Sequence, residues 1–225
     1  MSLQHDFIEF ALDTKVLRFG EFKTKAGRLS PYFFNLGLFN TGSTLARLAD
    51  FYAKTLLAAR ERGEIEFDMI FGPAYKGIPL AAAVAVKLAE MGCDIPYAFN
   101  RKEAKDHGEG GVIVGKKFQD REKIAIIEDV ITAGTAIRAV LPLLKSQADV
   151  DITALIISVD RMERGQGEKS ALTEISEKYG MKTTAIVTMA EVVEHLYNKP
   201  YKGKVIIDDE LKKAIDAYYD QYGVK

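Results

Sequence analysis

The chain has 225 residues, of which 48% are apolar and 28% are charged, a composition typical of a folded globular protein. Its 31 basic and 32 acidic residues leave a net charge of −1, which excludes a broadly basic surface for nucleic acid or an anionic membrane but not a small cationic pocket. The single cysteine, Cys93, excludes an intrachain disulfide and a multi-cysteine zinc site, and we expect a cytoplasmic protein without a secretory signal or membrane span.

The first 40 residues differ from the rest of the chain. They contain an expected helix over about residues 4–14 and then an aromatic, turn-rich stretch, Gly27–Asn35. We expect residues 1–40 to form a small N-terminal segment, and residues 41–225 to form a core that ends in a helix. No repeat or linker interrupts the sequence, so residues 1–225 are expected to form a single domain.

Short apolar runs alternate with helical patterns along the core. The expected strands cover residues 67–71, 123–127, 152–159 and 183–188. The expected helices cover residues 79–91, a segment ending near 144, and residues 168–179 and 209–222. This alternation predicts an α/β fold with a central, mostly parallel sheet flanked by helices. We assign the last helix a packing role only.

Residues 101–117 do not follow this alternation. They carry five basic and three acidic residues, a histidine and four glycines, and we expect a long polar loop. Its cations Arg101, Lys102 and Lys105 and the nearby His107 suit a leaving group on which negative charge develops. The glycines suit a lid that closes over a site, whereas the plainer alternative is a solvated surface loop.

Residues 124–135 carry the strongest chemical signal. A buried strand delivers Glu128 and Asp129 to the carboxyl edge of the sheet, where ligands of open α/β sheets bind. Gly134 follows between Thr132 and Thr135, at the start of a helix whose free N–H groups suit a phosphate. The acids suit the hydroxyls of a sugar that carries that phosphate. The segment fits neither a Walker A loop nor a dinucleotide-binding turn, and its plain alternative is a capped helix with two solvated acids.

A second strand-to-helix turn, Gly72–Gly77, is expected at the same edge of the sheet. Its backbone N–H groups together with Lys76 suit a pyrophosphate. By itself this turn favours the plainer interpretation, an exposed lysine in a Pro/Gly turn.

Together these motifs resemble the orotate phosphoribosyltransferases, a family of type I phosphoribosyltransferases. The resemblance rests on four segments between about residues 20 and 165: residues 124–136, Arg101–Gly110, Gly72–Gly77, and Lys25 with Gly27–Asn35. It implies a type I phosphoribosyltransferase fold with a small N-terminal hood and a long flexible catalytic loop. It also implies a homodimer in which the Arg101–Gly111 loop reaches the neighbouring site.

The implied reaction transfers ribose 5-phosphate from 5-phosphoribosyl 1-diphosphate to N1 of orotate in UMP synthesis. Mg²⁺ is implied as cofactor, held mainly by the donor and water and without direct protein ligands. The resemblance gives catalytic roles to Lys105, Arg101, Lys102, His107 and Asp129. It gives donor-binding roles to Lys25, Tyr75, Lys76, Arg101, Lys102, Lys105, His107, Glu128, Asp129, Val130, Ile131, Thr132, Ala133, Gly134, Thr135 and Ala136. It assigns orotate binding to Phe33, Phe34, Thr132 and Arg161.

Several alternatives stay open at this point. Arg161 suits a substrate carboxylate, but its alternative is a surface ion pair with Asp160 or Glu163. Phe33 and Phe34 lie in a turn-rich segment, where such a pair most often anchors the core. A purine phosphoribosyltransferase, or a non-catalytic regulator that senses the donor or binds RNA, would share the donor-binding segments. Three remaining residues are expected to be structural or to lie on the surface: His5, His195 and Cys93.

Overall fold

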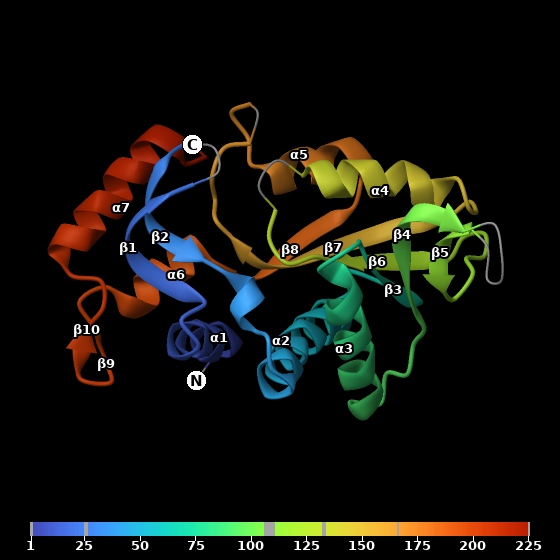
Figure 1. The fold of residues 1–225 in the computed structure, drawn as a ribbon, viewed down its shortest axis with the longest axis horizontal. Coiled ribbons are helices and arrows are strands. Elements are labelled where there is room, and N and C mark those ends of the chain that lie inside the picture. Colours follow the sequence, from blue (N-terminus) through green and yellow to red (C-terminus); the bar gives the residue numbers. More distant parts are fainter. Residues whose placement is uncertain (1, 25–26, 106–110, 132–133, 166, 225) are drawn as a thin grey trace.

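A six-stranded sheet forms the centre of the computed structural model, which describes residues 2–24, 27–105, 111–131, 134–165 and 167–224 (Figure 1). The strand order is β5-β4-β3-β6-β7-β8, and every pair is parallel except β4–β5. The strands are β3 (Met69–Gly72), β4 (Tyr97–Lys105), β5 (Gly111–Gly115), β6 (Lys123–Ile127), β7 (Asp151–Asp160) and β8 (Lys182–Thr188). The predicted, mostly parallel α/β sheet is therefore confirmed.

Helices cover both faces of this sheet. In Figure 1, α4 (Thr135–Lys145) and α5 (Ala171–Tyr179) lie on one face, and α2 (Gly42–Glu61) and α3 (Gly77–Glu90) lie on the other. Successive side chains of a strand point to opposite faces of the sheet, as β6 shows. Ile124 and Ile126 belong to the core cluster of α4 and α5, whereas Ala125 and Ile127 belong to the cluster of α2 and α3. This burial on both faces explains why the strands read as continuous apolar runs.

The N-terminal segment is built differently from the sequence-based expectation. Helix α1 (Leu3–Asp13) is present, but most of the predicted turn-rich stretch 27–35 is a strand, β2 (Leu29–Phe34). It pairs with β1 (Leu17–Lys23) in an antiparallel hairpin, followed by the 3-10 turn η1 (Leu36–Leu38). The aromatic residues obey the period of a strand, because Tyr32 and Phe34 are buried while Phe33 lies on the other face.

The predicted loop over residues 101–117 is also shorter than expected. Strand β4 continues to Lys105, and β5 begins at Gly111 and pairs antiparallel with it. The remaining elements are α6 (Met189–Leu196), the two-residue strands β9 (Pro200–Tyr201) and β10 (Lys204–Val205), and α7 (Asp209–Tyr222). The predicted C-terminal helix is thus confirmed at both ends.

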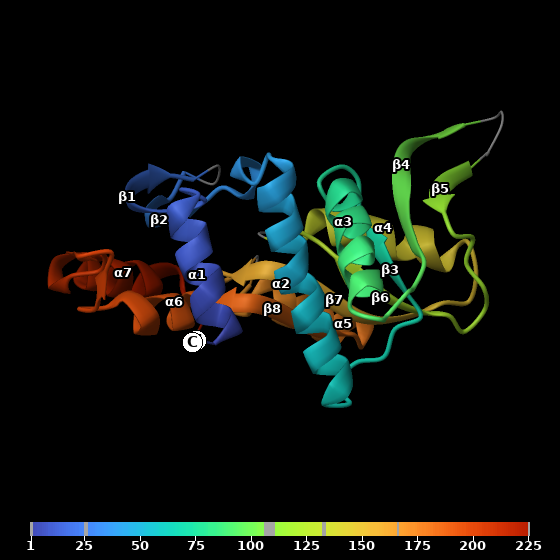
Figure 2. The ribbon, with the colours of Figure 1, turned by 90° about the horizontal axis from the view of Figure 1, so that it is seen from below.

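Figure 2 shows how these parts frame one side of the sheet. The β1–β2 hairpin and the β4–β5 hairpin rise on the same side, and the turn that leads into α3 lies between them. Helix α7 packs beside β2, at the hood end of the molecule. Within the described residues, none of the helices is both long and apolar enough to cross a membrane.

Candidate active site

The carboxyl end of β6 presents two neighbouring acids. Glu128 is buried, and its Oε1 accepts a hydrogen bond from the backbone N–H of Asp129 at 2.9 Å. Oδ1 of Asp129 accepts from the N–H of Val130 at 2.7 Å. These backbone bonds fix both carboxylates at the edge of the sheet, as the sequence predicted.

Two residues that the sequence analysis did not single out brace this edge. The hydroxyl of Tyr52, on α2, donates to the carbonyl of Glu128 at 2.7 Å. Ser158, on β7, donates to the carbonyl of Asp129 from its hydroxyl at 2.7 Å and from its N–H at 2.9 Å. In the sequence, Ser158 stands out as a serine inside an apolar strand. The structure buries it fully, and a buried hydroxyl needs a hydrogen-bond partner.

Burial dominates the electrostatics of Glu128. It raises the pKa of this carboxyl to about 7, and the adjacent charge of Asp129 adds to the rise. The N–H of Asp129 opposes the shift by binding the charged form, and Lys76 opposes it more weakly. Near neutral pH this carboxyl is therefore poised between its protonated and its charged form.

The turn after β3 lies against the same acids. Lys76 Nζ is 2.6 Å from Asp129 Oδ2, so the lysine predicted for pyrophosphate meets the acid predicted for ribose. The turn is tight: a Cβ on Gly72 would lie 2.1 Å from the carbonyl oxygen of Gly77. Asn100 on β4, which the sequence analysis missed, accepts from the N–H of Ala74 at 2.9 Å.

Helix α4 begins directly beyond the acids. Gly134 is its N-cap residue, with a φ of 69°, and no side chain caps the first turn. The positive φ favours glycine here, and a Cβ at this position would lie 2.9 Å from Ile175 Cδ1, the end of a side chain that can shift. Thr135 and Ala136 open the helix and Ile131 precedes the turn, whereas Thr132 and Ala133 lie outside the described residues. The uncapped N–H groups suit an anion.

Lys102 on β4 faces the turn after β3. Lys102 Nζ lies 4.6 Å from the ring centroid of Tyr75, and Arg101 precedes it on the strand. The backbone of Lys105 pairs with Gly111 at the end of the strand. His107 lies outside the described residues, as does Lys25 of the hood.

The hood separates the two predicted phenylalanines. Phe34 is 8% exposed and belongs to the core, as the packing alternative stated. Phe33 is half-buried on the opposite face, where its ring stacks on Phe22 with centroids 5.4 Å apart and lies beside the guanidinium of Arg18. The two side chains therefore do not point to one place.

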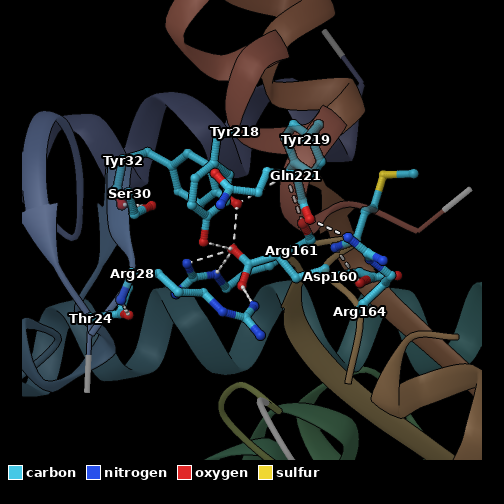
Figure 3. A network of polar contacts seen from close by, with 12 residues as sticks. Thr24, Arg28, Ser30, Tyr32, Asp160, Arg161, Arg164, Tyr218, Tyr219 and Gln221 are labelled. Carbon is cyan, nitrogen blue, oxygen red and sulfur yellow. Dashed lines mark hydrogen bonds and ion pairs between the residues drawn. The ribbon is translucent and has the colours of Figure 1, made fainter. Parts of the chain in front are cut away.

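Arg161 follows β7 and adopts the ion pair that the alternative interpretation named. Its Nε and Nη2 donate to Glu163 Oε1 at 2.9 and 2.6 Å, and its guanidinium lies 5.1 Å from the ring centroid of Tyr32 (Figure 3). With a side chain only 14% exposed, it is not a loose surface arginine. Glu163 is a further residue that the sequence analysis did not assign to the site.

The residues predicted to be structural have local partners. His5 and His195 stack with ring centroids 4.1 Å apart, and Cys93 accepts a hydrogen bond from Arg60.

A cavity of about 780 Å³ lies between the β1–β2 hairpin and α7, and its lining residues do not include Glu128 or Asp129. In the part of the chain that the structure describes, no three His, Cys, Asp or Glu side chains gather as a metal site.

Comparison with known families gives a consistent result. The phosphoribosyl transferase domain family matches residues 42–170, a span that contains both strand-to-helix turns and Arg161. The orotate phosphoribosyltransferase of Lachnoclostridium phytofermentans is 57% identical over 221 residues, covering 98% of this chain and 97% of that protein. That of Clostridium acetobutylicum is 53% identical over 223 residues, with 99% and 98% covered.

Solved structures agree with these sequence matches. The crystal structure of orotate phosphoribosyltransferase from Francisella tularensis superimposes with a TM-score of 0.83 at 40% identity. The match covers 97% of this chain and 99% of that one, so it includes the hood and the C-terminal helix as well as the central sheet.

Proposed function

The chain belongs to the orotate phosphoribosyltransferase family, and from this premise we propose how its residues carry out the reaction. The enzyme transfers the ribose 5-phosphate group of 5-phosphoribosyl 1-diphosphate to N1 of orotate. The products are orotidine 5′-monophosphate and pyrophosphate, and the step belongs to pyrimidine (UMP) synthesis.

One observation carries this proposal. The two acids at the end of β6 lie between an uncapped helix N-terminus and a lysine, with Asp129 Oδ2 2.6 Å from Lys76 Nζ. This order of groups is complementary to a ribose with an anion at each end. The helix N-terminus suits one anion, the acids suit the neutral hydroxyls, and the lysine suits the second anion. Glu128 and Asp129 hold the 2′- and 3′-hydroxyls, and the segment from Val130 to Ala136 holds the 5′-phosphate.

The pyrophosphate end of the donor lies over the turn after β3. Tyr75 and Lys76 bind it there, and Arg101, Lys102, Lys105 and His107 approach it from the β4–β5 hairpin. Within one subunit, Lys102 contacts the ring of Tyr75. In the homodimer that we propose, the Arg101–Gly111 segment acts at the site of the neighbouring subunit, so the hairpin that approaches a bound donor belongs to the partner.

Mg²⁺ fits the chemistry of this edge. The donor and water would supply its ligands, because Mg²⁺ commonly keeps several waters and binds substrate phosphates, and the nearby carboxylates of Glu128 and Asp129 suit a cation. When bound, the ion neutralises part of the charge on the pyrophosphate. The residues of the chain do the rest: Lys76 leaves Asp129 for the donor, and the two acids orient the sugar.

Orotate binds between the hood and the loop that follows β7. Phe33 and Phe34 contribute backbone groups from the hood together with Lys25, and Thr132 contributes from the phosphate turn. Arg161 pairs with the carboxylate of the base, the group that distinguishes orotate from uracil. The buried position of Arg161 beside Tyr32 supports this role, because the guanidinium is held where the hood meets the core.

Catalysis on this scheme needs no covalent nucleophile. N1 of orotate loses its proton and forms a bond to C1′ while the C1′–O bond to pyrophosphate breaks. The bonding electrons leave with the pyrophosphate, and the proton passes to the pyrophosphate or to water. Fixed cations stabilise the charge that develops on this leaving group, and the site holds N1 of orotate close to C1′ of the donor. Closure of the hairpin excludes water, which would otherwise hydrolyse the activated sugar.

We propose that the reaction takes place in the cytoplasm and that residues 1–225 form one domain.

A purine phosphoribosyltransferase is the competing enzyme, and a non-catalytic sensor of the donor is the competing binding protein. Both would keep the donor-binding edge, but neither needs Arg161. The decisive experiment mixes the purified protein with donor, Mg²⁺ and either orotate or a purine base, and follows the absorbance of the base. We expect turnover with orotate and none with the purine base. Turnover with the purine base but not with orotate, or turnover with neither base, would contradict the proposal.

A further inference from the structure

Glu163 lies at the centre of a polar cluster where three parts of the chain meet. Its Oε1 accepts hydrogen bonds from the hydroxyls of Tyr32 on β2, at 2.8 Å, and Tyr218 on α7, at 3.0 Å (Figure 3). The same oxygen accepts both bonds from Arg161. Arg28, from the hood, approaches Oε2 at 3.7 Å. The cluster therefore joins the hood, the loop after β7 and the C-terminal helix.

The bonds divide the guanidinium of Arg161 into two edges. Nε and Nη2 donate to Glu163, while Nη1 donates no hydrogen bond to the described residues. The ring of Tyr32 supports the guanidinium from one face. The arginine is thus fixed by one edge and one face, and the edge at Nη1 remains for a carboxylate.

The backbone of Arg161 is held as well. Tyr219 on α7 donates from its hydroxyl to the carbonyl of Arg161 at 2.6 Å, and its oxygen lies 3.0 Å from the hydroxyl of Tyr32. Both Arg161 and Glu163 are about 15% exposed, so water does little to screen their pairing. Burial and the nearby charge of Glu163 both raise the energy of ionising the tyrosines, so that the pKa values of Tyr32 and Tyr219 lie above the ordinary range.

The charges in the cluster do not cancel. Two guanidinium groups, of Arg28 and Arg161, face the single carboxylate of Glu163. The carboxylate of Glu163 is already bound by Tyr32 and Tyr218, so its position does not depend on Arg161. It can therefore hold the guanidinium in one orientation. The excess positive charge remains for an anion that arrives at the open edge.

We propose that Glu163, anchored by Tyr32 and Tyr218, is a positioning residue that orients Arg161 toward the carboxylate of the base, and that α7 thereby contributes to base recognition. The inference rests on the proposed function, because it takes orotate as the anion. It goes beyond that function by giving the C-terminal helix, which lies outside residues 42–170 matched by the family, a part in substrate selection.

The alternative is a purely structural tie between α7, the hood and the core. Glu163→Gln separates the two roles, because the amide oxygen still accepts from both tyrosines while the charge that holds Arg161 is lost. A tie that is only structural would lower the melting temperature and change the KM values of both substrates together. A positioning role changes the KM for orotate selectively.

The experiment compares steady-state kinetics of the wild-type enzyme, Glu163→Gln, Arg161→Ala and the double variant. We expect Glu163→Gln to raise the KM for orotate about tenfold and to leave the KM for the donor within about twofold. Competition by uracil, which has no carboxylate, should not change. In the Arg161→Ala background the second substitution should have no further effect on the KM for orotate, since the residue acts through Arg161.

Glu64→Gln is the matched control. Glu64 pairs with Arg62 at the same two-residue spacing, with Nε and Oε1 2.7 Å apart, but on the exposed end of α2. It should leave both KM values unchanged. If Glu163→Gln does not fold, Tyr218→Phe serves instead. It should raise the KM for orotate by about threefold, because it removes one of the hydroxyls that anchor the carboxylate and leaves the charge in place.

The outcomes separate the two claims. Absence of orotate turnover in the wild-type enzyme would overturn the proposed function. An active wild type with an unchanged KM for orotate in Glu163→Gln and in Tyr218→Phe would overturn the positioning role alone. Independent, additive effects of Arg161→Ala and Glu163→Gln would do the same, as would equal rises in both KM values.

Discussion

The two sides of the proposed site are built on different principles. The donor side consists of the Gly72–Gly77 turn and residues 128–136, and it presents backbone N–H groups and two acids from short, continuous segments. The base side consists of β2, Arg161, Glu163 and α7, and it is held by side chains that are far apart in sequence. Tyr32 and Glu163, for example, are 131 residues apart. A phosphate can be bound by local backbone geometry, whereas this recognition of the base depends on tertiary packing.

The comparison predicts that charge changes on the donor side have the largest effects. Asp129→Asn keeps an oxygen for the N–H of Val130 but loses the charge that pairs with Lys76 and that we propose for a ribose hydroxyl. We expect kcat/KM for the donor to fall by about 10²–10³, the usual cost of removing one preorganised electrostatic contact. Steady-state kinetics at saturating orotate measure this loss.

Asp120→Asn is the control for that variant. Asp120 is an exposed acid whose Oδ1 likewise accepts from a backbone N–H, that of Asp149, at 3.0 Å. Its replacement should leave kcat/KM unchanged. A loss of less than threefold in Asp129→Asn would mean that the donor side does not depend on this charge.

The hairpin cations should affect the chemical step rather than binding. If Lys105 meets charge that develops on pyrophosphate, Lys105→Ala lowers kcat by about 10² while the Kd for the donor changes only a few-fold. Rapid-quench kinetics and equilibrium binding of the donor measure the two quantities. Lys117→Ala, an exposed lysine beyond β5, is the control, and equal losses in rate and affinity in Lys105→Ala would contradict a lid role.

The pKa of Glu128 makes a prediction about stability. Burial raises this pKa from 4.5 to about 7, so the folded protein binds a proton that the unfolded chain releases between these values. The carboxyl therefore costs stability as pH rises from about 4.5 to 7, by up to about 3 kcal/mol. Below pH 4.5 both states are protonated and the cost disappears.

Glu128→Gln isolates this term because the amide does not titrate. The free energy of unfolding of the wild type, relative to the variant, should fall across that range of pH and then level off. Denaturant titrations at a series of pH values measure the difference. A difference that is flat with pH, or that rises, would show that Glu128 is charged in the free enzyme.

The same contrast explains what the sequence could predict. The strands that bear the donor side are apolar runs followed by glycine turns, so Ile124–Ile127 and the acids after it were located from local pattern alone. Residues 101–105 contain no apolar alternation, so the local pattern predicts a loop. They extend β4 instead, and its pairing with β5 is interrupted after Asn100 and resumes at Lys105. Helix α2 was not assigned, although its buried residues Leu48, Tyr52 and Leu56 follow helical spacing.

On the base side the limits have a physical cause. Arg161 was identified as a candidate, and its pairing with Glu163 was named as an alternative, because the two residues are neighbours in sequence. The hydroxyls of Tyr32, Tyr218 and Tyr219 were not assigned, since only the docking of α7 on β2 brings them to that pair. No local pattern encodes a contact between segments so far apart.

The smallest expected effect tests this dependence on distant packing. Tyr219→Phe keeps the ring against Tyr32 but removes the hydroxyl that binds the carbonyl of Arg161. We expect the KM for orotate to rise about two- to threefold, since one neutral hydrogen bond that acts through another residue is lost. The KM for the donor should stay the same. Tyr197→Phe, which removes a hydroxyl bond to Asp209 on the exposed surface, is the control. If Tyr219→Phe changes the donor KM as much as the orotate KM, the two sides are not independent, and α7 supports the whole site rather than the base side.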